Sequence, residues 1–208
     1  ILGGSLFLKT SFTFSKMSVE KNNNLLPDVG EIKKKDSNRT NILLLGLRGE
    51  KDPYGGLLTD TIILVSVHKT LGKAALISIP RDLYVEMPDN SERQKINFAH
   101  ALGEEKKRGY GGLIYAKAVV QKVTGEYIDG VISVNFKAFE EIVDILGGID
   151  IYLDKPFVEN QQFTNEIILN LPKGLNHLVG KRALFFARSR FTTSDFDRMR
   201  RQQLVILA

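Results

Sequence analysis

Residues 131–153 read VISVNFKAFEEIVDILGGIDIYL, and this stretch decides the fold class. Val131–Val134 is a short apolar run typical of a strand, and Asn135 is a residue type favoured at helix N-caps. The apolar residues that follow recur at the spacing of one helix face, at Phe139, Ile142, Val143 and Leu146. Gly147 and the glycine after it end this predicted helix, and Ile149–Leu153 predicts the next strand.

The segments upstream and downstream extend this alternation of strands and helices. Ile42–Leu45, Thr61–Val67 and Ala74–Ile79 are short runs of apolar or β-branched residues, which suit buried strands. Residues from Gly111 to Val123 have helical spacing, and a final helix is predicted over Asp197–Ala208. Strands that alternate with helices indicate a layered α/β domain.

Composition narrows the function classes only slightly. The chain has 208 residues, which suits one large domain or two small ones. It has no cysteine, so disulfides and thiolate metal sites are excluded. The 29 Lys and Arg against 24 Asp and Glu give a net charge of +5. This mild excess is compatible with nucleic acid, a phospholipid surface or a phosphorylated substrate, and it does not choose among them.

Several familiar catalytic motifs are missing from the sequence. It contains no GxxxxGK[ST] phosphate loop, no GxGxxG after a strand, no HExxH and no GxSxG. The sequence therefore offers no familiar protein nucleophile. If the protein is an enzyme, we expect it to work through binding and electrostatics.

Arginines gather in three segments that suit an anionic ligand. Arg81 follows Pro80 at the carboxyl end of a predicted strand, the sheet edge where open α/β sheets bind ligands. Arg188 and Arg190 would share one face of an extended stretch and form a clamp for phosphate, but they would diverge on a helix. On the last helix one face carries Arg198, Arg201 and Gln202.

A carboxylate near these arginines is a candidate metal ligand. Asp60 immediately precedes a predicted buried strand. Mg²⁺ is typically held by one or two carboxylates together with substrate phosphates, so Asp60 could hold Mg²⁺ beside an arginine-bound pyrophosphate. The alternative is that Asp60 only caps the entry to the strand.

These segments occur in the order and spacing of a known family. The chain resembles the LytR-CpsA-Psr domain over about Asn41 to Ala208. Each block alone is weak, but so many in the right order are specific. The blocks that carry the resemblance are Asn41–Gly46, Thr59–Thr61, Ser78–Asp82, Lys95–Ala99, Val134–Phe136, Val143–Ile149, Ala183–Arg190, Asp195–Arg198 and Arg201–Gln203.

The resemblance implies a three-layer α/β/α sandwich with a central mixed sheet and a lipid-binding pocket. It implies a phosphotransferase that moves a glycopolymer, such as a teichoic acid or capsule, from a polyprenyl-pyrophosphate carrier to a peptidoglycan hydroxyl in cell-wall assembly. No nucleic-acid partner is expected, because the sequence contains no recognised nucleic-acid-binding motif. The catalytic residues would then be Asp60, Arg81, Arg188 and Arg190, and Asp60 would hold Mg²⁺ or help to position the nucleophile. The residues implied to contact the pyrophosphate are Arg81, Arg188, Arg190, Arg198 and Gln202.

One position departs from the family pattern. The family usually has an aspartate two residues after the glycine of its first strand, where this chain has Arg48. A Mg²⁺ site would lose a ligand and gain a nearby positive charge, so we expect little need for Mg²⁺ in binding. The alternative is that Arg48 turns to solvent while Asp52, or else Glu50, takes the empty place.

The resemblance also sets the expected domain organisation. Residues 1–17, which begin with an apolar run, would be the outer end of a truncated N-terminal membrane anchor. Residues 18–40 are polar and would form a linker. Residues 41–208 would form the catalytic domain, with the C-terminus also truncated. The protein would then be a single-pass protein of the cell membrane, with its catalytic domain outside.

Three rival functions are also compatible with the sequence. A lipid pyrophosphatase would use water as the acceptor. A lipid-binding protein without catalysis would suit the arginine at position 48. A nucleic-acid-binding regulator would suit the pI of about 9.3, although no recognised nucleic-acid motif supports it.

Overall fold

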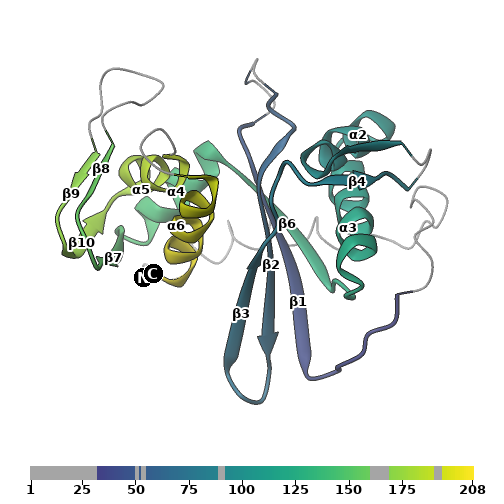
Figure 1. Cartoon of the computed structure of the whole chain (residues 1–208), viewed down its shortest axis with the longest axis horizontal. Helices are drawn as coiled ribbons and strands as arrows, with labels where there is room; N and C mark the ends of the chain where they lie inside the picture. Colours follow the sequence, from purple (N-terminus) through teal and green to yellow (C-terminus); the bar gives the residue numbers. More distant parts are fainter. Residues whose placement is uncertain (1–31, 50–51, 53–54, 89–91, 160–168, 190–193) are drawn as a thin grey trace, which may run out of the picture.

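The computed structural model describes residues 32–49, 52, 55–88, 92–159, 169–189 and 194–208 (Figure 1). Its centre is a four-stranded sheet with the strand order β3-β2-β1-β6. β1 pairs with β6 in parallel, whereas the β1–β2 and β2–β3 pairs are antiparallel. The sheet is therefore mixed, as expected. Its strands are β1 (Arg39–Leu47), β2 (Thr59–His68), β3 (Lys73–Ser78) and β6 (Gly130–Asn135).

One face of the sheet is covered by a helical layer with a small hairpin (Figure 1). Leu43 and Leu45 of β1 pack on this side against residues such as Val119, which is fully buried. The elements of this layer are β4 (Tyr84–Glu86), β5 (Arg93–Lys95), η2 (Ile96–Phe98), α2 (Ala99–Lys106) and α3 (Gly111–Thr124).

The opposite face carries three more helices, and short strands lie beyond them (Figure 1). A second core cluster forms here around Val143, Ile151 and Phe186. The helices are α4 (Phe136–Ile145), α5 (Gly180–Arg188) and α6 (Asp195–Leu207). The short strands are β7 (Ile149–Leu153), β8 (Phe157–Glu159), β9 (Leu169–Leu171) and β10 (Gly174–Leu178). The three-layer α/β/α architecture expected from the sequence is confirmed.

The stretch that decided the fold class folds as predicted. The Asn135 side chain accepts a hydrogen bond of 2.8 Å from the Ala138 N–H and caps α4. Gly147 has φ of 82° and Gly148 has φ of 101°, a region that favours glycine, so the helix ends there. β7 then spans Ile149–Leu153, the predicted range.

Two elements, β1 and α6, begin earlier in the chain than the sequence predicted. β1 begins at Arg39, inside the predicted linker of residues 18–40, because Arg39 and the two residues after it pair with β2. Lys34 also forms an ion pair with Asp129, so this end of the linker contacts the domain. α6 begins at Asp195, because Ser194 and Asp197 form a capping box.

The expected membrane anchor over residues 1–17 lies outside the described residues. Among the helices that the structure does describe, none is both long enough and apolar enough to cross a membrane.

Candidate functional site

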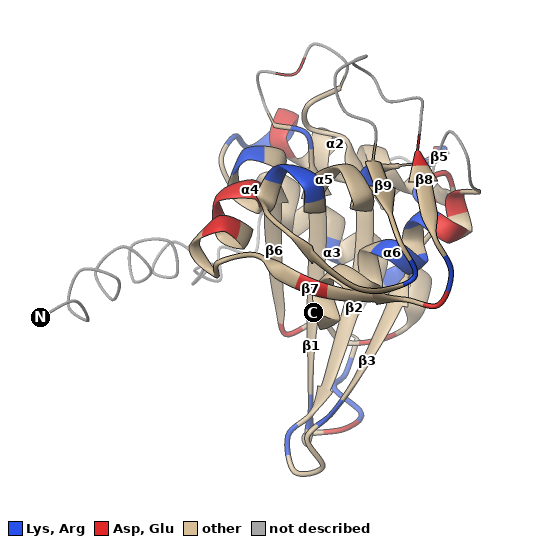
Figure 2. Cartoon of the chain, turned by 90° about the vertical axis from the view of Figure 1, so that its left-hand side faces the viewer, with Lys and Arg blue, Asp and Glu red and all other residues tan. Residues whose placement is uncertain are grey.

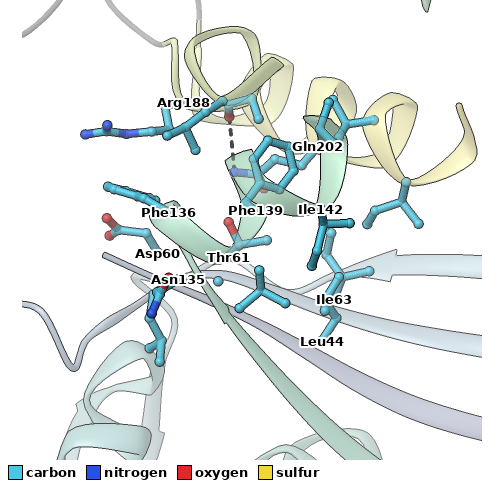
Figure 3. Close-up of a pocket in the computed structure, with 18 of the residues that line it drawn as sticks. Leu44, Asp60, Thr61, Ile63, Asn135, Phe136, Phe139, Ile142, Arg188 and Gln202 are labelled. Carbon is cyan, nitrogen blue, oxygen red and sulfur yellow. Dashed lines mark hydrogen bonds between the residues drawn. The ribbon is translucent and has the colours of Figure 1, made fainter. Parts of the chain in front are cut away.

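A pocket of about 580 Å³ opens between the central sheet and the helices α4, α5 and α6. Its two ends differ in chemistry. In Figure 3, Asp60 and Arg188 lie at one end, whereas Ile63, Ile142 and Leu44 lie at the other. Arg48 and Arg81 also line the pocket and pair with Asp60. The pocket therefore joins a charged end to an apolar end.

The apolar end explains an odd feature of α4. The apolar face predicted from helical spacing includes Ile142 and Leu146, and these residues are 49% and 71% exposed. Both line the pocket, together with Phe139 and Val143 of the same face. The amphipathic face of α4 is thus a pocket wall and only partly a core surface.

Strand topology brings the charged residues together at one edge of the sheet. Asp60 is the second residue of β2, next to the carboxyl end of β1, where Leu47 pairs with Thr59. Arg81 lies just after β3, whose carboxyl end is at the same edge, and it lines the pocket. The strands approach closely here, since a Cβ on Gly46 would lie 2.8 Å from the Thr61 Cβ. The structure thus brings Arg81 and Asp60 to one edge of the sheet.

The Asp60 carboxylate lies between two guanidinium groups. Arg48 Nε donates to Asp60 Oδ2 at 3.1 Å, and Arg81 Nη1 donates to Asp60 Oδ1. Arg48 also forms an ion pair of 3.8 Å with Asp52. Arg81 additionally approaches Asp82, with 3.5 Å between Nε and Oδ2.

This arrangement keeps Asp60 ionised. Burial alone would raise the pKa of Asp60, but the hydrogen bond from Arg48 and the charge and hydrogen bond of Arg81 outweigh it, so the pKa is lowered. A carboxylate with a lowered pKa is a weak proton acceptor. Asp60 is therefore better suited to hold the arginines than to act as a general base.

Arg188 forms the other side of the charged end. Its guanidinium carbon lies 3.9 Å from the centroid of the Phe136 ring, over which it stacks (Figure 3). Burial lowers the pKa of Arg188, and the like charge of Arg48 lowers it further. The site thus concentrates positive charge in partly desolvated surroundings, which favours an anionic ligand.

Helix α6 supplies two predicted site residues and a structural one. Arg198 and Gln202 line the pocket, and Gln202 Nε2 donates to the Ala187 carbonyl at 3.3 Å (Figure 3). Arg198 forms an ion pair of 2.7 Å with Asp195. Arg201, predicted on the same helix face, is also buried but bonds instead to the carbonyls of Phe186 and Ser189.

The predicted clamp of Arg188 and Arg190 is only partly described. Arg188 is the last residue of α5, so it is helical and not extended as the clamp required. Arg190 lies outside the described residues. Phe136 was not predicted as a site residue, although it stands in the Val134–Phe136 block that carried the resemblance. Phe136 directly follows the helix cap Asn135, which is also the last residue of β6, and this position at a strand end could have marked it as a site residue.

The residues at Asp60 do not fit the Mg²⁺ site that the resemblance implies. Each oxygen of Asp60 already accepts a hydrogen bond from a guanidinium. Arg48 also pairs with Asp52 and does not turn to solvent, since only 20% of its side chain is exposed. In the part of the chain that is described, no group of three or more His, Asp or Glu side chains gathers that could hold a metal ion. Glu50 lies outside that part.

Comparisons with known proteins identify the family. The sequence model of the LytR_cpsA_psr family matches residues 7–208. This chain belongs to that family. It is 33% identical over 180 residues to the polyisoprenyl-teichoic acid–peptidoglycan teichoic acid transferase TagU of Bacillus cereus, and the match covers 86% of this chain and 54% of the relative.

Solved structures agree with the family assignment. The crystal structure of B. subtilis TagT matches with a TM-score of 0.67 and 27% identity, over 91% of this chain and 71% of that one. A family protein called YwtF (TagT), solved with bound octaprenyl pyrophosphate lipid, matches with a TM-score of 0.65 and 26% identity, over 91% and 71% of the two chains. The present chain spans about half the length of the TagU relative.

Figure 2 shows how charge is distributed around the helical side of the family domain. α4 carries acidic residues and the neighbouring α5 carries basic ones (Figure 2). The two helices are joined by a hydrogen bond of 2.7 Å from the Gly180 N–H to Asp144. This contact ties the start of α5 to the end of α4.

Proposed function

We propose that this protein is a phosphotransferase that moves a glycopolymer from a polyprenyl-pyrophosphate carrier to a peptidoglycan hydroxyl. The observation that carries the proposal is the pocket, which joins an arginine-lined end to an apolar end. Such a shape suits a ligand with an anionic head and a hydrocarbon tail. The related YwtF (TagT) structure with bound octaprenyl pyrophosphate and the name of the TagU relative support it.

In the proposed reaction the acceptor hydroxyl attacks the phosphorus on the glycan side of the pyrophosphate. A new P–O bond forms, the bond to the bridging oxygen breaks, and polyprenyl phosphate leaves while the hydroxyl proton passes to solvent. The guanidiniums of Arg81 and Arg188, with that of Arg190, would neutralise the charge that develops on the phosphoryl oxygens. Asp60 would hold Arg48 and Arg81 in position.

The reaction can be tested with the intact protein, the lipid-linked glycan and peptidoglycan. The proposal expects glycan covalently attached to peptidoglycan fragments after digestion. If water is the acceptor instead, free glycan phosphate accumulates and no linked fragment forms. If the protein only binds lipid, neither product appears.

The apolar wall gives a first prediction. Ile142→Glu places a carboxylate on the pocket face of α4, where the prenyl chain would otherwise pack against isoleucine. We expect the affinity for geranylgeranyl pyrophosphate to fall about 10- to 100-fold, because the lipid would desolvate a charge and bury less apolar surface. Affinity for inorganic pyrophosphate should stay unchanged. Calorimetric titration with both ligands measures the difference.

Ile145→Glu is the matched control for this variant. Ile145 lies on the same helix and is 71% exposed, but it does not line the pocket. Its substitution should leave both affinities unchanged. Equal losses of affinity in the two variants, or no loss in Ile142→Glu, would show that this wall does not hold the lipid.

We further propose that the domain lies outside the cytoplasmic membrane and that a single N-terminal anchor holds it there. The apolar start of the chain and the membrane-borne carrier of the proposed reaction support this. Protease added to intact protoplasts should remove the domain. Digestion of the domain only after lysis would place it on the cytoplasmic side of the membrane.

A further inference from the structure

Arg48 occupies a central place in the charged end of the pocket. It follows β1 at the edge where β2 begins, lines the pocket, and has only 20% of its side chain exposed. Its Nε lies 3.1 Å from Asp60 Oδ2, and its Nη1 lies 3.8 Å from Asp52 Oδ1. Two carboxylates thus hold this guanidinium at the pocket.

The charges around Arg48 favour an anion without added metal. The pocket lining contains one carboxylate, that of Asp60, and four guanidiniums, those of Arg48, Arg81, Arg188 and Arg198, so positive charge is in excess in the lining. The site therefore already carries the kind of charge that a bound divalent cation would supply.

Guanidinium chemistry fits this role. Arginine stays charged at all ordinary pH values and has five N–H donors in a planar fork that matches phosphate oxygens. The hydrogen bond to Asp60 uses one of these donors, Nε. Because the carboxylate fixes the fork, less conformational entropy is lost when a ligand binds.

We propose that Arg48 is the built-in cation of this site, which binds the pyrophosphate directly and makes a divalent cation unnecessary for binding. Asp60 is then a positioning residue for Arg48 and Arg81, and not a metal ligand. The proposal rests on the pyrophosphate-lipid site proposed above, and it identifies Arg48 as the cation that this site uses in place of a metal ion.

Geranylgeranyl pyrophosphate is the probe, titrated calorimetrically into the whole protein in EDTA and then in MgCl₂. The wild type should bind in EDTA, with a Kd that Mg²⁺ changes by less than about threefold. Arg48→Gln should weaken binding in EDTA about 10- to 100-fold, the effect of losing one charged donor group, and Mg²⁺ should not restore it.

Arg48→Asp should lose the same affinity in EDTA but regain it with Mg²⁺. The substitution puts a third carboxylate beside Asp52 and Asp60, which creates the oxygen ligands that Mg²⁺ prefers. Electron paramagnetic resonance of Mn²⁺ should show binding to this variant and not to the wild type. Arg200→Asp is the control, since Arg200 is exposed on α6 and lies outside the pocket lining.

Each outcome decides the inference. Strict Mg²⁺ dependence in the wild type would overturn the role of Arg48 while leaving the lipid site in place. Unchanged metal-free binding in Arg48→Gln would also overturn it. Failure of the wild type to bind the probe in either medium would overturn the lipid site and this inference together. If circular dichroism shows Arg48→Asp unfolded, the Arg48→Gln titration decides.

Discussion

Replacing Arg81 by alanine is expected to slow glycan transfer about 30- to 1000-fold, a loss of about 2–4 kcal/mol of transition-state stabilisation. Arg81 lines the pocket and donates to Asp60, with only 18% of its side chain exposed. Its charge would act where negative charge develops on the phosphoryl oxygens. The fold should survive, because Asp60 keeps its hydrogen bond to Arg48.

The measurement is kcat/KM in a reconstituted transfer assay, with folding checked by circular dichroism. Arg81→Lys keeps the charge but not the planar fork, so it should recover only part of the rate. Arg93→Ala, an exposed arginine on β5, is the control and should transfer normally. Near-normal transfer by Arg81→Ala would remove this residue from the proposed mechanism.

Replacing Arg201 by alanine should produce the largest loss of stability, about 3–5 kcal/mol in the free energy of unfolding. Arg201 is 6% exposed, and its Nε donates to the Phe186 carbonyl at 3.0 Å. Its Nη2 donates to the Ser189 carbonyl, and its guanidinium lies over the Phe157 ring at 4.8 Å. The substitution leaves two buried carbonyls without these donors.

A second buried charge adds to this loss. Glu159 is fully buried and accepts a hydrogen bond of 2.5 Å from the Ser189 hydroxyl, beside the segment that Arg201 holds. Burial lowers the pKa of Arg201, whereas the charges of Asp197 and Glu159 favour its protonated form. Without Arg201, the buried Glu159 carboxylate loses part of the positive charge that offsets its own charge.

Urea unfolding and thermal melting measure the effect. A loss of this size corresponds to a fall in Tm of about 6–20 °C for a chain of this length. Arg200→Ala removes the neighbouring exposed arginine and should change stability by no more than about 0.5 kcal/mol. A comparably small change in Arg201→Ala would show that α6 does not hold the end of α5 in this way.

Local signals in the sequence predicted much of the fold. Helical spacing located α4, the Asn135 cap fixed its start, and the glycine pair fixed its end. β-branched and apolar runs located β2 and β3, although β3 is an edge strand with mostly exposed residues and is not buried as predicted. These features depend on neighbours along the chain, so they can be read without the tertiary structure.

The sequence predicted residues of the site, but it could not predict the contacts among them. Arg81 and Asp60 were singled out from their places at strand ends, but their hydrogen bond depends on which strands pair and in what register. Arg201 shares a predicted face with Arg198, yet the partner across that face is α5, which helical spacing cannot identify. α5 ends at Arg188, and Ser189 already has a non-helical backbone with φ of −54° and ψ of 134°, a change within one residue that pattern analysis cannot resolve.

Following the glycan-side phosphorus tests the central claim most directly. The carrier is prepared with ³²P only at the phosphorus attached to the glycan, and is incubated with the intact protein and peptidoglycan. Digested peptidoglycan fragments should carry the label, while the released polyprenyl phosphate should be unlabelled. Label in polyprenyl phosphate, or only in soluble glycan phosphate with none on peptidoglycan, would contradict the proposed transfer.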